Sequence, residues 1–151
     1  MADTPWLSPR EMRAWDGFLT ASALVHRRLE QQLKGDSGLS HQQYEVLVRL
    51  ADAPGSELRM TELANGLINS KSGISYTITQ MEKAGLVRRR SCPSDVRGVF
   101  AVLTDAGRAR LEEAAPGHVA TVREILIDVL TPEQLDALAT GLGEVGRRLR
   151  P

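Results

Sequence analysis

The chain has 151 residues, of which 42% are hydrophobic and 25% are charged, and its 19 basic side chains balance its 19 acidic ones. This composition indicates a globular chain of about one domain and excludes a disordered one. No apolar run approaches the roughly 18 residues that cross a bilayer, so we expect no membrane contact.

A capping box opens the first expected helix. Ser8 stands at the cap, Pro9 suits the first helical position, and Glu11 follows where its carboxylate reaches back to the cap. Gly35 and Gly38 are expected to end this helix. Its apolar residues recur at the spacing of one helical face, with Ser22 filling one gap: Met12, Trp15, Leu19, Val25, Leu29 and Leu33.

Three more helices are expected before the pattern changes. Ser40–Gln43 is a second capping box, and Pro54-Gly55 stops the helix that it opens. A short helix covers about Met60 to Leu67, and a fourth helix runs from about Lys71 to Ala84, where Gly85 ends it.

A β-hairpin is expected after the fourth helix. Leu86–Arg90 and Val99–Leu103 are apolar or alternating runs typical of strands. Pro93–Gly98 between them has turn composition, which predicts a hairpin with a long loop.

Two long helices are expected to close the chain. The fifth helix starts at the cap Thr104-Asp105 and reaches about Leu130, and Pro116 is expected to kink or interrupt it. Thr131–Gln134 is a third capping box and opens the sixth helix. The apolar face of the sixth helix carries Leu135, Leu138, Leu142, Val145 and Leu149.

Positive charge concentrates in the middle of the chain. Between Arg59 and Phe100 there are seven basic and three acidic residues, which gives this segment a net charge of +4. Local charge, rather than the zero net charge of the whole chain, decides whether a surface attracts phosphate. The segment therefore indicates contact with a nucleic acid.

The fourth helix offers a surface suited to DNA. Ile74, Ile78 and Met81 share one face and should pack inward. The opposite face is mostly small and hydroxylated, as close approach to phosphates and base edges requires. Ser70 or Ser72 is expected to cap the helix near a phosphate. The candidate DNA-binding residues are Ser70, Lys71, Ser72, Ser75, Tyr76, Thr79 and Lys83; the alternative is the solvated face of an ordinary helix.

The hairpin adds a second set of candidates. Arg97 lies near the tip, where it could enter a minor groove, and Asp95 could pair with it and fix its rotamer. Arg88, Arg89 and Arg90 alternate across the first strand, so at least one should face phosphate; Arg88 and Arg90 are the candidates. The alternatives are a surface ion pair, worth at most about 1 kcal/mol, and a charged edge that prevents strand pairing.

Four short motifs in a fixed order carry a family resemblance. They are Thr61–Ala64, Met81–Val87, Ser94–Gly98 and Val102–Gly107. Together they resemble the core of the MarR family of transcriptional regulators. The layout, with two helices before this core and two long helices after it, also matches, so the resemblance covers nearly the whole chain.

The resemblance implies a mostly helical α+β fold, in which a winged helix-turn-helix core with a two-stranded wing is flanked by N- and C-terminal dimerisation helices. It implies one domain over residues 1–151, with a DNA-binding lobe at about 40–103 and dimerisation helices at about 8–35 and 104–150. The implied function is a sequence-specific regulator that binds double-stranded DNA as a homodimer. It is implied to be a repressor released by a small-molecule effector, with Arg97 reading the minor groove.

The terminal helices independently favour a dimer, because their apolar stripes exceed what a small winged-helix core covers. The alternative is burial in one larger core within the chain. The resemblance also implies an effector pocket in the crease between the dimerisation and DNA-binding parts. Trp15 and His26 are candidates for its wall, although packing in the core or the dimer is the favoured role of Trp15.

The remaining reactive residues favour no further chemistry. Cys92 is the one cysteine, which fits a cytoplasmic protein; a passive role is favoured over a redox thiol activated by nearby arginines. His26, His41 and His118 lack metal-ligand spacing and are interpreted as capping or surface residues. With neither a Gly-rich phosphate loop nor a nucleophile elbow, we expect no enzyme, no cofactor and no metal. The alternative function is a winged-helix module that binds protein and has no operator.

Overall fold

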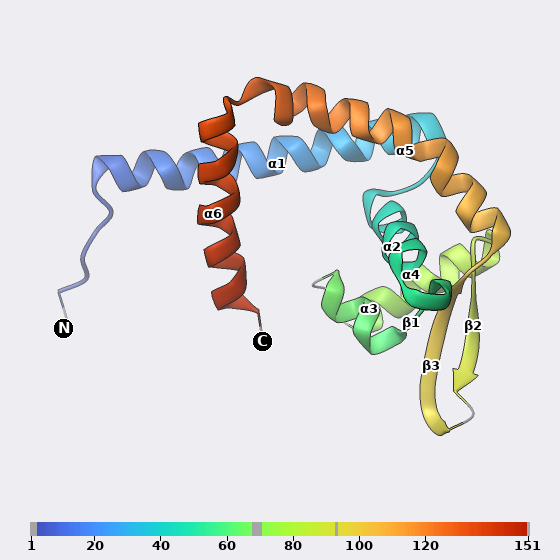
Figure 1. Ribbon diagram of the computed structural model, residues 1–151. Coiled ribbons are helices and arrows are strands. Elements are labelled where there is room, and N and C mark those ends of the chain that lie inside the picture. The colour runs from blue at the N-terminus through green and yellow to red at the C-terminus, as the bar shows by residue number, and fades with distance from the viewer. Residues whose placement is uncertain (1–2, 68–70, 93, 151) are drawn as a thin grey trace. The chain divides into compact units, whose positions relative to one another are not determined.

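The computed structural model describes residues 3–67, 71–92 and 94–150; at residues 71 and 95–97 it describes the backbone but not the side chains. The described residues form a mostly helical fold with a small antiparallel sheet (Figure 1), which confirms the predicted fold class. The helices are α1 (Pro9–Ser37), α2 (His41–Asp52), α3 (Met60–Gly66), α4 (Lys71–Lys83), α5 (Asp105–Ile125) and α6 (Pro132–Leu149). The strands are β1 (Glu57–Arg59), β2 (Val87–Cys92) and β3 (Asp95–Leu103), and short 3-10 helices cover Pro54–Ser56 and Ile127–Val129.

Local side-chain hydrogen bonds fix where three helices begin. Before α1, the Ser8 hydroxyl accepts from the Glu11 backbone N–H at 3.2 Å, and the Glu11 carboxylate accepts from the Ser8 N–H at 2.7 Å. Ser40–Gln43 and Thr131–Gln134 make the same reciprocal pair at α2 and α6. All three predicted capping boxes are confirmed. Each satisfies N–H groups that have no partner inside the helix.

Two predictions about helix ends need correction. α1 ends just before Gly38, as predicted, but Gly35 lies inside the helix. α5 continues through Pro116 and ends at Ile125 rather than at Leu130, so of the predicted kink or interruption the helix shows no interruption. A proline removes one N–H and leaves one carbonyl without its usual partner, a loss that a helix tolerates where the proline is exposed, as it is here.

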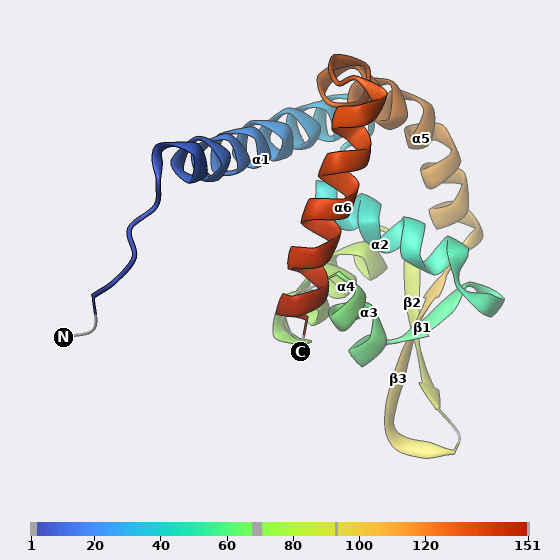
Figure 2. The ribbon, with the colours of Figure 1, turned by 60° about the vertical axis from the view of Figure 1, so that its left-hand side comes forward.

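The sheet contains a strand that the sequence did not reveal. β1 pairs antiparallel with β3, and the strand order is β1–β3–β2. Three residues are too few to show a period of two, so β1 carries no periodic signal. The hairpin strands are also longer than predicted: β2 reaches Cys92 and β3 starts at Asp95, so the predicted long loop is wrong. Figures 1 and 2 both show this hairpin extending beyond helices α2, α3 and α4.

The hydrophobic core lies in one of two compact units, the one formed by residues 30–118. It joins the end of α1, helices α2, α3 and α4, the sheet and the first half of α5. The largest side chains that are less than 2% exposed are Leu33, Leu39, Leu47, Leu50, Leu63, Ile74, Ile78, Met81, Val46 and Val87. This core fixes the position of α4 and of the hairpin.

The second compact unit, residues 1–29 with 119–151, has a different surface. Among the described residues, all exposed large apolar side chains except Tyr76 belong to it. They are Trp6, Leu7, Met12, Trp15, Phe18, Leu19, Leu24, Val119, Val129, Leu142, Val145 and Leu149. None of the described helices combines the length and the apolar character needed to cross a membrane.

Candidate nucleic-acid interface

One face of α4 is locked into the core. Ile74, Ile78 and Met81 are at most 1% exposed, which confirms that they pack inward. The Thr77 hydroxyl is buried with them and donates to Gln42 Oε1 on α2 at 2.8 Å. These contacts fix the rotation of α4 about its own axis, and its opposite face is turned to solvent.

The solvent face of α4 is polar. Ser72, Ser75, Tyr76 and Lys83 are exposed, and Tyr76 is 67% exposed although it is aromatic. Thr79 is half-buried, and its hydroxyl donates to the Ser75 carbonyl at 2.9 Å. The face therefore offers hydroxyls, a phenol and an ammonium group at the surface.

The start of α4 corrects one prediction. The helix begins at Lys71, so Ser72 lies in its first turn and is not the cap. Ser70, the other predicted cap, lies outside the described residues. Lys71 is described by its backbone alone. The DNA contacts predicted for Ser70 and Lys71 stay predictions.

Arg89 joins α4 to the hairpin, a role that the sequence did not suggest. Its guanidinium donates to Glu82 Oε1 at 3.1 Å, and to the carbonyl and hydroxyl oxygens of Ser75 at 2.9 and 3.2 Å. Its backbone N–H donates to Glu82 Oε2 at 3.0 Å. Arg89 thus fixes the direction in which β2 leaves α4, and it is a candidate positioning residue rather than a candidate DNA contact.

The outer face of the sheet holds Arg90 in an ion pair with β1. Arg90 donates two hydrogen bonds to the Glu57 carboxylate, at 2.7 and 3.0 Å, and its guanidinium lies 4.4 Å from the centre of the Phe100 ring. These hydrogen bonds lower the pKa of Glu57. Arg59 lies over the same ring at 5.2 Å. Arg88 points to solvent, so it is the exposed member of the three consecutive arginines.

The tip of the hairpin carries the other predicted residues. Asp95 and Arg97 both lie in β3, where the backbone is described and the side chains are not. Their pairing and the role of Arg97 in a minor groove stay predictions. Cys92 at the end of β2 has its Sγ 3.2 Å from the Ser94 hydroxyl and 4.0 Å from Arg59 Nη2.

The structure corrects the interpretation of one histidine. His118 on α5 is 9% exposed, so it is not a surface residue, and its ring lies 4.2 Å from that of Tyr44 and 6.0 Å from that of His41. Burial first, and then the neighbouring His41, lower the pKa of His118, while Glu45 opposes the shift. His118 Nδ1 is buried without a hydrogen-bond partner among the described residues. Such a group costs about 1–3 kcal/mol.

The two candidates for an effector pocket lie on α1. Trp15 is 50% exposed, and its ring centre is 6.3 Å from that of Phe18. His26 is exposed, and its Nδ1 lies 2.7 Å from the Ser22 carbonyl oxygen. Both residues belong to the unit of exposed apolar side chains. Their predicted role in binding an effector stays a prediction.

Comparison with known proteins identifies relatives across the whole chain. The family model described as MarR family matches residues 37–98. The crystal structure of Sco3205, a MarR family transcriptional regulator from Streptomyces coelicolor in complex with DNA, is 42% identical and has a TM-score of 0.96. The alignment covers 100% of this chain and 94% of Sco3205.

Two further relatives agree. AbsC, a MarR family transcriptional regulator from Streptomyces coelicolor, is 44% identical with a TM-score of 0.93, over 97% of this chain and 99% of AbsC. The transcriptional repressor YetL from Bacillus subtilis is 32% identical over 112 residues, or 74% of this chain. The aligned part spans 66% of YetL, slightly less than two thirds of that protein.

Proposed function

The chain belongs to the MarR family of transcriptional regulators, and we propose that it represses a promoter by binding duplex DNA as a homodimer. The main support for this proposal is that an exposed, hydroxylated face of α4 lies beside an arginine-rich hairpin. Arg89 joins this hairpin to the same helix through hydrogen bonds. A helix fits the major groove and a hairpin reaches the adjacent backbone or minor groove, so the two together match a duplex.

The candidate residues have distinct roles in this proposal. The solvent face of α4 enters the major groove, with Ser72, Ser75, Tyr76, Thr79 and Lys83 toward bases and phosphates. Arg88 contacts phosphate, and Arg97 with Asp95 reads the minor groove from the tip of the hairpin. Arg90 supports the hairpin through Glu57 and adds positive charge beside it. We place the DNA-binding lobe at about residues 40–103.

Fluorescence anisotropy tests this proposal directly. The purified chain is titrated with the intergenic duplex beside its own gene and with a scrambled duplex, over a range of salt concentrations. We expect preference for the native duplex and a steep decrease in affinity with salt, because each phosphate contact releases counterions. Equal and weak binding to both duplexes, across a set of neighbouring intergenic regions, would contradict the proposal and favour a module that binds protein.

The exposed apolar side chains of residues 1–29 and 119–151 support the homodimer. Solvent-facing positions on α1 and α6 carry large apolar groups, such as Phe18, Leu142 and Val145, which are 45%, 41% and 51% exposed. Apolar area of this extent is costly in water and marks an interface. The same surface on a second copy would cover it with twofold symmetry. We therefore assign the terminal helices to dimerisation.

A charge on the apolar face of α6 should weaken the dimer. Leu142→Glu places a carboxylate in the proposed interface, and its desolvation should raise the dimer dissociation constant about tenfold or more. Thr140→Glu, on an exposed position of the same helix away from the stripe, is the matched control and should leave the constant unchanged. Analytical ultracentrifugation measures both. If the Leu142→Glu chain dimerises like wild type, α6 is not part of the dimer interface.

We propose that a small-molecule effector releases the dimer from DNA. The effector would favour a dimer whose two α4 helices no longer match the half-site spacing, and DNA affinity would decrease. Trp15 and His26 on α1 are the candidate contacts. Family membership supports this part of the proposal, together with a regulatory rather than a catalytic role and a cytoplasmic location.

A further inference from the structure

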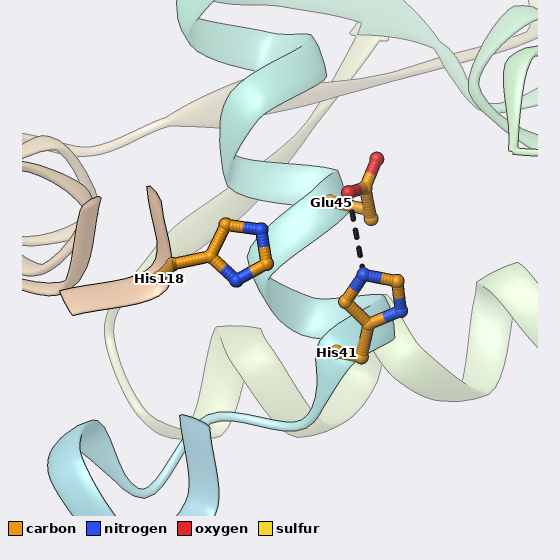
Figure 3. A group of neighbouring side chains, drawn as sticks. All are labelled: His41, Glu45 and His118. Atoms are coloured by element: carbon orange, nitrogen blue, oxygen red, sulfur yellow. Dashed lines mark ion pairs between the residues drawn. The ribbon is translucent and has the colours of Figure 1, made fainter. Parts of the chain in front are cut away.

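Three potential metal ligands from two helices meet in the unit of residues 30–118. His41 and Glu45 lie one turn apart on α2, and His118 points toward them from α5 (Figure 3). One ligand atom from each side chain lies within 4.8 Å of the others. We propose that His41, Glu45 and His118 bind a divalent transition-metal ion of the zinc type. This inference is independent of the proposed DNA binding.

The distances are close to those of a metal site. His41 Nε2 lies 3.5 Å from Glu45 Oε1. Two ligand atoms of a tetrahedral zinc ion, each about 2.0–2.1 Å from the metal, are separated by about 3.3 Å. The pair on α2 already has nearly this separation, and the ligand atom of His118, which lies within 4.8 Å of both, would move closer when the ion binds.

The backbone holds the two α2 ligands in place. Ser40 and Gln43 fix the first turn through the capping box. The Glu30 carboxylate on α1 accepts from the His41 backbone N–H at 2.8 Å. His41 therefore starts α2 at a defined position, and Glu45 follows one turn later on the same side. Because these ligands are already ordered, metal binding has a smaller entropic cost.

Hydrogen bonds do not compensate for the burial of the His118 ring in the core. Its Nδ1 is buried and has no hydrogen-bond partner among the described residues, while its ring packs on Tyr44. A buried imidazole with an unsatisfied nitrogen is unfavourable unless the ring gains another strong interaction. Coordination through the other ring nitrogen, Nε2, which Figure 3 shows turned toward Glu45, would supply it. The side chains of His41 and Glu45 are 25% and 35% exposed, which leaves an entry path from solvent.

The donor set selects the class of ion. Two imidazole nitrogens and one carboxylate oxygen suit zinc and neighbouring first-row metals, whereas calcium and magnesium prefer oxygen ligands alone. Three protein ligands leave a fourth position for water. A bound ion would also connect α2 to α5, because the ligands that these helices carry are far apart in the sequence.

Isothermal titration of the chelator-treated full-length chain with zinc chloride tests the site. We expect one zinc ion per chain, and a higher unfolding temperature when zinc is present. His41→Ala and Glu45→Gln should each weaken zinc binding by more than about 100-fold. Loss of a residue that only supports a ligand, without touching the metal, typically weakens binding by about 10- to 100-fold. Both positions are partly exposed, so these variants should fold even if His118→Ala does not.

Glu113→Gln is the matched control for Glu45→Gln, because Glu113 is an exposed carboxylate on α5 outside the cluster. It should bind zinc as wild type does and keep the zinc-dependent rise in unfolding temperature. Circular dichroism confirms that each variant is folded. Wild-type and His41→Ala chains that bind zinc equally, or a wild-type chain that binds none at millimolar zinc, would overturn the proposal.

Discussion

Gly107→Ala should destabilise the chain by about 3 kcal/mol or more, the largest stability effect that we expect from a single methyl group. Gly107 lies in the first turn of α5, where its N–H donates to the hydroxyl of the cap Thr104 at 3.0 Å. A Cβ added at Gly107 would overlap the carbonyl oxygen of Leu86 and lie 2.8 Å from Leu103 Cδ1. Backbone cannot move aside as the end of a flexible side chain can.

The crowding follows from how α5 meets the sheet. The Thr104 N–H donates to the same Leu86 carbonyl at 3.2 Å, and the Thr104 hydroxyl donates to the Gly85 carbonyl at 2.7 Å. These bonds draw the start of α5 against the segment that leads into β2. A side chain at Gly107 would have to break them or shift the helix, and either change would disturb the position of the hairpin.

Thermal unfolding at one protein concentration measures the effect. A loss of about 3 kcal/mol corresponds to a decrease of about 6–12 °C in Tm for a chain of this size. Gly35→Ala is the matched control, since Gly35 lies inside α1 with open space around its missing Cβ. It should raise stability by up to about 1 kcal/mol, because alanine is the better helix former. Equal Tm values for the two variants would mean that the contact at Leu86 relaxes easily.

Arg97→Ala should weaken operator binding by about 1–3 kcal/mol, or about 5- to 150-fold, and leave the dimer intact. Under the proposed function, Arg97 inserts its guanidinium into the minor groove from the hairpin. Minor grooves concentrate negative potential, so an inserted arginine contributes more than a surface charge does. Anisotropy with the native duplex measures affinity, and ultracentrifugation measures the dimer.

Two controls separate a groove contact from a change in net charge. Arg123→Ala removes the same charge from an exposed ion pair with Asp128 and should change affinity little. Arg97→Lys keeps the charge but loses the planar fork, so its affinity should fall between those of alanine and arginine. An Arg97→Ala chain with wild-type affinity would contradict the minor-groove role of Arg97. Arg88 and α4 would then be the contacts to test.

Much of the fold was readable from short-range patterns. The three capping boxes depend on residues three positions apart, and the structure shows each of them. The inward face of α4 followed from the helical spacing of Ile74, Ile78 and Met81. Such signals are reliable because both partners lie within one helical turn, so the sequence contains the whole interaction.

The helices, the two faces of α4, the hairpin and the family could all be predicted from the residues alone. Which charged and polar groups meet depends on how the elements pack in three dimensions, and it followed from the fold. The fold created β1 through pairing with β3, put Arg90 on Glu57, 33 residues away, and turned Arg89 toward α4. It also brought His118 to His41. These contacts join residues distant along the chain, and their geometry depends on how whole elements pack, which no local spacing records.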